Sequence, residues 1–452
     1  MANMTSDTVR AAGEAGLSSR ATSAAGETAA RHSHAGHAAL VQDERVHSSI
    51  YTDPAIFADE MANIFERCWI FVGHDSEIPN PGDFRTRKIG KQPVLFVRGR
   101  DGVARVLMNR CTHRGVQLCI EDRGNASRFT CPYHAWTFLN TGDLIGVPYP
   151  ERYENGVEKA EFGLRPVPRV AEYRGFTFAS LSADGPSLDD YLGPLVKAEI
   201  DIAVDLSPVG RISVSAGTHK FGYDGNWKLQ AENSVDAYHL NFLHQSFLQI
   251  TQNRAGVDGR GMGTSGSPAL IRSLGNGHVS WDTSPMGMEL QFIGSDGSKD
   301  DWRENYKAAL IERHGIERAR FLWARSAPHV LIFPNLVLIS SQIRVIQPIA
   351  ADRTEVFLMP SLLEGVPDEL NQQRLRGHEA FYGPAGGGAT DDMEIFERQM
   401  SGFRATVDPW IYMGRGVGME QARPDGSVEG QITDELGSRA FLRQWKAMMT
   451  AA

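Results

Sequence analysis

The chain has 452 residues, enough for two or three domains with a sizeable core. Its 41% hydrophobic and 22% charged residues are those of an ordinary globular protein, and four cysteines are too few for a disulfide scaffold. Asp and Glu (55) outnumber Lys and Arg (46), so the net charge of −9 argues against nucleic-acid binding, and the expected free thiols favour the cytoplasm.

Residues 1–47 are rich in Ala, Ser, Thr and Gly and poor in large apolar side chains. Such a segment buries too little surface to offset the entropy of ordering, so we expect a poorly ordered N-terminal extension. It contains His32, His34 and His37, which are compatible with a metal cluster, but a flexible tail is the favoured interpretation. It lacks the apolar central region of a secretory signal.

Residues 48–185 change in character, and their pattern predicts a small β-rich domain. Short apolar runs at 92–99, 103–110 and 175–182 are separated by Gly, Pro and Asp, which is typical of strands and turns.

Residues 186–452 predict a second domain of the α+β class. Longer, helix-like patterns at 196–204, 227–244, 300–315 and 390–403 alternate with strand-like runs at 211–221, 278–284 and 354–362. The most apolar stretch, 329–348, is interrupted by Pro334, Asn335, Gln342 and Arg344, so we expect two strands there and no membrane span.

Two Cys/His motifs lie in the β-rich region, Cys111-x-His113 in NRCTHRG and Cys131-x-x-His134 in CPYHAW. Thiolates and imidazoles suit zinc or an iron–sulfur cluster, and the four ligands alone are equally compatible with both. Zinc sites of this composition usually have two cysteines on one turn and two histidines on another, whereas each turn here supplies one cysteine and one histidine. A Rieske [2Fe–2S] centre, with two cysteines on one iron and two histidines on the other, fits that arrangement better.

Other residues near these motifs have expected roles of their own. Gly115 and Gly124 would let the backbone approach the cluster. Cys119 has no histidine at a matching distance, so we expect a buried structural thiol.

A second group of candidate ligands lies in QAENSVDAYHLNFLH, residues 230–244. Asp236 and His239 share a helix face, but His244 lies about 140° further around an ideal helix, so binding one metal through both histidines requires a bend. Non-haem iron that activates oxygen commonly takes two histidines and one carboxylate. The segment 383–399 offers Asp391 and Asp392, although spacing alone favours Thr390 as an N-cap with two acids in the first helical turn.

Taken together, NRCTHRG, CPYHAW, NWKLQAENSVDAYHLNFLH and GPAGGGATDD resemble the large (α) subunit of the Rieske non-haem iron aromatic-ring-hydroxylating oxygenases. The resemblance runs from about residue 48 to the C-terminus. Within the family, the motif sequences are nearest to those of the benzoate, toluate and anthranilate dioxygenases and the salicylate hydroxylases. It implies a β-rich Rieske domain followed by a catalytic domain with a curved antiparallel sheet covered by helices.

The resemblance also implies a role for each motif residue. Cys111, His113, Cys131 and His134 match the ligands of the [2Fe–2S] cluster, and His239, His244 and Asp392 match the ligands of a mononuclear Fe(II), with Asp391 as the alternative carboxylate. Asp236 matches an acid that links a cluster histidine of one subunit to an iron histidine of its neighbour. Asn233 matches an asparagine found near the iron.

The function implied is that of a terminal oxygenase component that uses O2 and NADH-derived electrons. We expect cis-dihydroxylation of an aromatic carboxylic acid such as benzoate, with monohydroxylation, as in a salicylate hydroxylase, as the alternative. A zinc-binding or electron-transfer protein without oxygenase activity is the alternative of another class. Expected partners are a reductase, a ferredoxin in some systems, a small β subunit and two further α subunits, in an α3β3 or α3 assembly. No G-x-G-x-x-G turn follows a strand, so we expect a separate reductase to use the nucleotide.

The substrate-binding residues are the least defined part of the sequence. Val235, Leu240, Phe242 and Leu243 suit an aromatic ring, but we expect ordinary core packing for each. Arg344 is compatible with a substrate carboxylate, yet a solvated side chain is the favoured interpretation.

Overall fold

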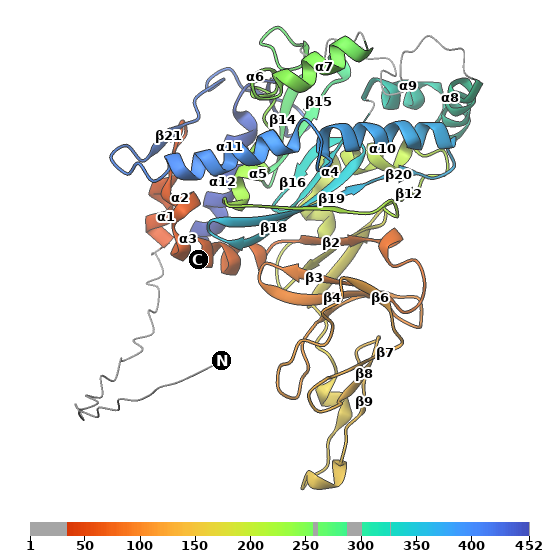
Figure 1. Cartoon of the computed structure of the whole chain (residues 1–452). Helices are drawn as coiled ribbons and strands as arrows, with labels where there is room; N and C mark the ends of the chain where they lie inside the picture. The colour runs from red at the N-terminus through yellow and green to blue at the C-terminus, as the bar shows by residue number, and fades with distance from the viewer. Residues whose placement is uncertain (1–33, 256–260, 287–300, 326, 452) are drawn as a thin grey trace, which may run out of the picture.

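The computed structural model describes residues 34–255, 261–286, 301–325 and 327–451. They form a β-rich unit and a larger α+β unit, so the predicted fold class is confirmed (Figure 1). Within these ranges no helix is both long and apolar enough to cross a membrane.

The β-rich unit contains three antiparallel sheets, with strand orders β10-β11-β2, β5-β4-β3-β6 and β7-β8-β9. The predicted runs 92–99, 103–110 and 175–182 form β4, β5 and β11. The strands are β2 (Ile70–His74), β3 (Asp83–Ile89), β4 (Gln92–Arg98), β5 (Ala104–Met108), β6 (Arg123–Asn125), β7 (Arg128–Thr130), β8 (Thr137–Leu139), β9 (Leu144–Gly146), β10 (Arg169–Tyr173) and β11 (Phe176–Ser180).

Strand β4 lies between two hydrophobic cores. Its alternating side chains point to opposite faces, so Val94 and Phe96 belong to the large core while Leu95 and Val97 belong to a smaller one. The smaller core also contains Cys111, Cys119, Cys131, Trp136 and Phe138. Apolar packing therefore supports the two turns that carry the Cys/His motifs.

The α+β unit is built on a nine-stranded antiparallel sheet in the order β13-β19-β18-β17-β16-β15-β14-β23-β22. Its strands are β13 (His219–Tyr223), β14 (Leu270–Gly275), β15 (His278–Asp282), β16 (His329–Ile332), β17 (Leu336–Ile339), β18 (Gln342–Ala350), β19 (Arg353–Pro360), β22 (Gln421–Ala422) and β23 (Val428–Gln431). A separate pair joins β12 (Ile212–Ser213) to β20 (Leu362–Leu363).

The stretch 329–348 forms three strands, β16, β17 and the first part of β18, so the prediction of two strands was wrong. The sequence pattern marks the turn at Pro334–Asn335 but hides the second turn, at Ser340 and Ser341. Ser340 has a positive φ of 55°, which lets the chain reverse between two apolar runs without glycine or proline.

Helices pack on the sheet and cover it (Figure 1). They are α4 (Leu188–Asp205), α5 (Trp227–Asn233), α6 (Leu240–Leu243), α7 (Gln245–Ala255), α8 (Asp301–His314), α9 (Ile316–Arg325), α10 (Asp368–Tyr382), α11 (Ala389–Gly402) and α12 (Leu436–Thr450). The predicted helices at 196–204, 300–315 and 390–403 correspond to α4, α8 and α11. The predicted helix at 227–244 is instead divided into α5 and α6, which are separated by residues 234–239.

The N-terminal segment that the structure describes is ordered, in contrast to the expectation for residues 1–47. It forms α1 (His34–Leu40), β1 (Arg45–His47), α2 (Ser49–Thr52), α3 (Pro54–Glu60) and a π-helical turn (Met61–Phe65). Strand β1 pairs with β21 (Trp410–Tyr412), and α1 packs on α12. Local composition could not reveal this order because the partners are near the other end of the chain. Residues 1–33, which include His32, lie outside the described residues.

The carboxylate of Glu60 joins the N-terminal segment to the α+β unit. It is fully buried and accepts hydrogen bonds from Lys228 Nζ and from the indole nitrogens of Trp227 and Trp445. Residues 48–65, which were predicted to belong to the Rieske domain, therefore pack on α5 and α12.

Candidate active site and redox centre

The two turns that carry Cys111 and Cys131 have the same backbone geometry. Gly115 N–H donates to Cys111 O at 3.0 Å, and Ala135 N–H donates to Cys131 O at 2.9 Å. The residue four positions after each cysteine has a positive φ, 77° at Gly115 and 53° at Ala135. The two motifs therefore form matching turns, although one places its histidine two residues after the cysteine and the other three.

The four predicted cluster ligands are brought together as a thiol pair and an imidazole pair. Cys111 and Cys131 are buried; burial raises the pKa of the Cys111 thiol, and the adjacent Cys131 thiol adds to the rise. The ring centroids of His113 and His134 lie 4.8 Å apart. His134 Nδ1 is buried without a hydrogen-bond partner. Two thiols, two adjacent imidazoles and an unsatisfied ring nitrogen fit a metal cluster.

Gly124 and Cys119 are two further residues for which the sequence suggested a role. A side chain at Gly124 would meet the ring of Phe84 at 2.7 Å, so this glycine makes room for an aromatic side chain, and its approach to the cluster stays a prediction. Cys119 is buried as expected, and burial raises the pKa of its thiol to about 11.

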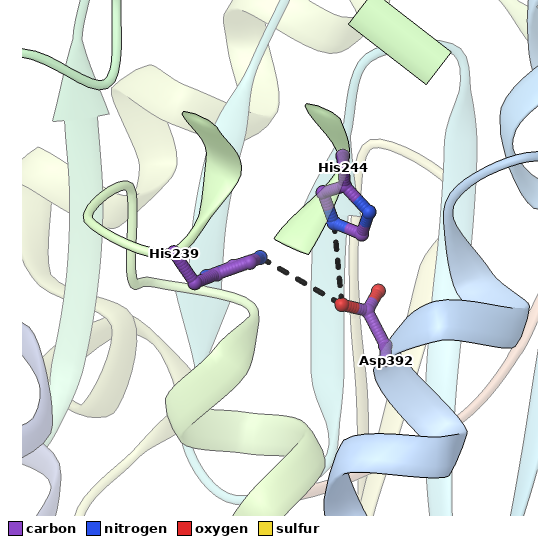
Figure 2. Close-up of side chains that lie close together, drawn as sticks. All are labelled: His239, His244 and Asp392. Carbon is purple, nitrogen blue, oxygen red and sulfur yellow. Dashed lines mark ion pairs between the residues drawn. The ribbon is translucent and has the colours of Figure 1, made fainter. Parts of the chain in front are cut away.

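The predicted iron ligands His239, His244 and Asp392 form one compact group (Figure 2). Asp392 Oδ1 lies 3.7 Å from His239 Nε2 and 3.3 Å from His244 Nε2. One ligand atom from each residue lies within 4.8 Å of the other two. The break before the short helix α6 supplies the bend that a continuous helix lacked, because His239 precedes this helix and His244 follows it.

Asp392 and Asp391 differ in exposure. The side chain of Asp392 is 8% exposed, whereas that of Asp391 is 40% exposed and lies 3.6 Å from His244 Nδ1. The prediction that Thr390 caps the helix was wrong: the N-cap residue is Gly388, and Thr390 Oγ1 donates to Gly386 O. Burial raises the pKa of Asp392, but contacts with His244 and His239 outweigh it and hold that pKa below its usual value.

Asn233 and Asp236 hold the group from the side of α5. Asn233 Nδ2 donates to Asp392 Oδ1 at 3.0 Å. Asp236 Oδ2 lies 3.2 Å from His239 Nδ1, which directs His239 Nε2 toward Asp392. Both ring nitrogens of the buried His244 lack a hydrogen-bond partner. Unsatisfied buried imidazole nitrogens beside a carboxylate fit a metal ion.

A cavity of about 330 Å³ opens beside this group. Its walls combine aromatic, polar and cationic side chains from α5, α6, α9, α10 and the sheet: Asn233, Ser234, Asp236, His239, Leu240, His244, Met262, Trp281, Thr283, Arg325, Ala327, Pro328, His329, Ile339, Ser340, Arg344, Phe381, Tyr382 and Asp392. This volume is within the range of small-molecule sites, and the aromatic walls suit an aromatic ligand.

Several residues around the cavity differ from expectation. Arg344 is only 4% exposed and lines the cavity, so the prediction of a solvated side chain was wrong. Val235 lies in the core as expected, whereas Phe242 is 71% exposed. Leu240 lines the cavity, and Leu243 is half-buried.

Sequence reasoning missed the remaining walls, chiefly Trp281, His329 and Tyr382. The rings of Trp281 and His329 stack at 3.5 Å, and burial lowers the pKa of His329 to about 3. No spacing rule links these residues, because they lie on β15, β16 and α10. They become neighbours of α5 and α6 only through the tertiary fold.

Comparison with known proteins places both groups of side chains within one family. Residues 68–171 match the family described as the Rieske [2Fe-2S] domain, and residues 205–451 match the catalytic domain of the ring-hydroxylating α subunit. The first range contains both Cys/His turns, and the second contains His239, His244 and Asp392.

Similar proteins agree with this assignment along most of their length. The chain is 35% identical to the large subunit of anthranilate 1,2-dioxygenase from Acinetobacter baylyi, over 86% of this chain and 85% of that protein. It is 34% identical to the large subunit of 2-halobenzoate 1,2-dioxygenase from Burkholderia cepacia, over 85% and 82%. The crystal structure of naphthalene 1,2-dioxygenase from a Rhodococcus species bound to indole superposes with a TM-score of 0.77 at 29% identity, over 90% of this chain and 94% of that one.

The two family matches explain why one chain has both a pair of Cys/His turns and a separate group of two histidines and a carboxylate beside an aromatic-lined cavity. The chain belongs to the Rieske ring-hydroxylating dioxygenases as a large, or α, subunit, and its cofactors are a [2Fe–2S] cluster and a mononuclear non-haem iron.

Proposed function

We propose that this chain forms the oxygenase component that cis-dihydroxylates an aromatic carboxylic acid. The observation that carries the proposal is the cavity of about 330 Å³ between the His239, His244 and Asp392 group and a buried arginine. Similarity to the anthranilate and 2-halobenzoate dioxygenases supports the same substrate class. A protein that only carried electrons would have no use for such a cavity.

The proposed cluster ligands are Cys111, His113, Cys131 and His134, and the proposed iron ligands are His239, His244 and Asp392. When bound, the cluster supplies single electrons and the iron supplies an open coordination position at which O2 is activated.

The protein's own contribution is to orient the ligands and the substrate. Asp236 accepts a hydrogen bond from His239 Nδ1–H, which favours the tautomer whose Nε2 is unprotonated and available to a metal. Asn233 fixes the carboxylate of Asp392 through its amide donor. Trp281, Phe381 and Tyr382 provide flat apolar walls for a ring.

We further expect electron transfer between subunits. Within one chain β7 and β8, which flank the Cys131 turn, lie in the lower part of the molecule, whereas α6 and α11 lie in the upper part (Figure 1). An α3β3 or α3 ring in which Asp236 meets a cluster histidine of the neighbour would bring the two centres together. A reductase, with or without a ferredoxin, would deliver electrons from NADH, and the reduced thiols that the cluster requires favour the cytoplasm.

The test is turnover by the purified oxygenase with a reductase under ¹⁸O2. Benzoate, anthranilate, salicylate and naphthalene would be compared, and products identified by mass spectrometry. A cis-diol of an aromatic acid that carries two ¹⁸O atoms is the expected result. One ¹⁸O atom would mean monohydroxylation, and oxidation of naphthalene alone would overturn the assigned substrate class.

A further inference from the structure

The cavity contains two arginines in different environments. Arg325 has two carboxylate partners, with Nη2 at 2.5 Å from Glu199 Oε2 and Nη1 at 3.0 Å from Asp282 Oδ1, although its Nε is buried without a hydrogen-bond partner. Arg344 has no carboxylate within 4.0 Å among the residues that the structure describes. Its Nη1 donates to Ser234 Oγ at 3.0 Å, and its Nε is buried without a partner.

A buried guanidinium without a counter-charge is costly, because arginine stays protonated in proteins and loses its hydration on burial. Asp392 interacts electrostatically with Arg344, but it lies beyond 4.0 Å from it, and its Oδ1 atom is contacted by Asn233, His239 and His244. The Arg344 Cζ atom lies 5.2 Å from the centroid of the Tyr382 ring, which supports the guanidinium plane. The site is therefore built for an anion that the described residues do not supply.

We propose that Arg344 binds the carboxylate of the aromatic substrate and so selects acids over neutral rings. This inference rests on the proposed aromatic-acid function and adds the residue responsible for it. A carboxylate accepts two parallel hydrogen bonds from the fork of a guanidinium, which includes the unpaired Nε. Ser234 Oγ accepts from Nη1 and holds the guanidinium, and Phe381 and Tyr382 then flank the attached ring.

The experiment compares wild type with Arg344→Gln, using benzoate and the neutral isostere benzamide. For Arg344→Gln, kcat/KM with benzoate should fall by at least about 30-fold, because the anion loses its charged partner. The loss with benzamide should be several-fold smaller, so the acid-to-amide preference collapses. Anaerobic calorimetric titration should give a matching increase in the Kd of benzoate, which does not depend on turnover.

Two further variants keep the test decisive. Arg344→Lys retains the charge without the fork, so we expect about a 10-fold loss for benzoate and correct folding even where the Gln variant fails to fold. Arg439 is buried to a similar extent, 3% exposed, but lies on α12 outside the cavity. Arg439→Gln is the matched control: it should lower stability without changing the acid-to-amide ratio.

The outcomes distinguish a failure of this inference from a failure of the proposed function. Equal losses for benzoate and benzamide, or an unchanged acid preference in both Arg344 variants, would overturn the role of Arg344 while the function stands. Wild-type enzyme that oxidises only neutral aromatics would overturn the function itself. Iron and cluster content of every variant, measured by metal analysis and visible absorption, would identify a loss caused by misfolding.

Discussion

At the scale of single residues, two adjacent carboxylates on α11 are expected to behave differently. Asp392 is buried against His239 and His244, whereas Asp391 is partly exposed. Asp392→Asn should reduce mononuclear iron to about a tenth of the wild-type occupancy or less, because a neutral amide binds a cation more weakly. Asp391→Asn should retain at least half of it. The ratio of iron to labile sulfide measures the iron occupancy of both variants. Loss of iron only in Asp391→Asn would mean that Asp391 is the ligand.

His278 should contribute to the acid sensitivity of folding. Phe333 N–H donates to His278 Nδ1 at 3.0 Å, and Nε2 lies 2.9 Å from Tyr191 O, so the buried ring is neutral. Burial lowers its pKa from 6.5 to about 4. Because the unfolded state binds the proton more tightly, this stabilisation is complete above pH 6.5 and is lost as the pH falls toward 4.

The variant that tests this is His278→Gln, and the control is His314→Gln, at a histidine that is only partly buried. Between pH 7.5 and pH 5, the free energy of unfolding of the wild type should lose about 2 kcal/mol through this group, a loss absent from His278→Gln. Urea unfolding at both pH values measures it. The same pH dependence in all three proteins would contradict the role of His278.

Predictability at this scale depended on whether a residue belonged to a local motif. Both Cys/His pairs and the histidines at 239 and 244 were found because each pair lies within six residues. Arg344 was misjudged because a strand sequence gives the alternation of its side chains but does not tell which element covers each face.

At the scale of elements, the spacing of His239 and His244 predicted that a helix must bend but not where. The structure replaces the bend with a complete break, residues 234–239, between α5 and α6. Ser234 Oγ donates to Gln230 O in this segment, and Asp236 Oδ1 accepts from Tyr238 N–H. Such short polar side chains compete with backbone hydrogen bonds and favour ending a helix.

The two Cys/His turns allow a paired test of backbone strain. Gly115→Ala places a side chain at a φ of 77°, which costs about 1 kcal/mol, whereas Ala135→Gly removes a comparable cost at 53°. Thermal bleaching of the cluster absorption should shift down by about 2–4 °C for the first variant and up or not at all for the second. Similar downward shifts for both would mean that the turns are not equivalent.

At the scale of the whole molecule, β7 and β8, which flank the Cys131 turn, lie in the lower part of Figure 1, whereas α6 and α11, which carry or flank the proposed iron ligands, lie in the upper part. If electrons cross between subunits, two inactive variants should complement each other. His239→Ala lacks the iron site, Cys111→Ser lacks the cluster, and no single chain in their mixture has both. Each mixed cyclic trimer then has one productive interface out of three, which predicts up to about a third of the wild-type activity for trimers that contain both variants.

The measurement is turnover by co-expressed, differently tagged chains purified through both tags. Each variant alone should show about 1% of wild-type activity or less, in line with the loss of a whole redox centre. Mixed trimers without activity would contradict transfer between subunits. Activity of a purified wild-type monomer would do the same.

The sequence by itself determined the α+β class, the two metal-binding motifs and the family, because these depend on local spacing and on motifs that few unrelated chains share. Only the tertiary structure decided that residues 34–47 form regular structure, that Asp392 and not Asp391 is the buried carboxylate, and that Arg344 is buried in the cavity. Each of these depends on contacts between segments far apart in the chain, and burial and charge pairing exist only once those segments have packed together.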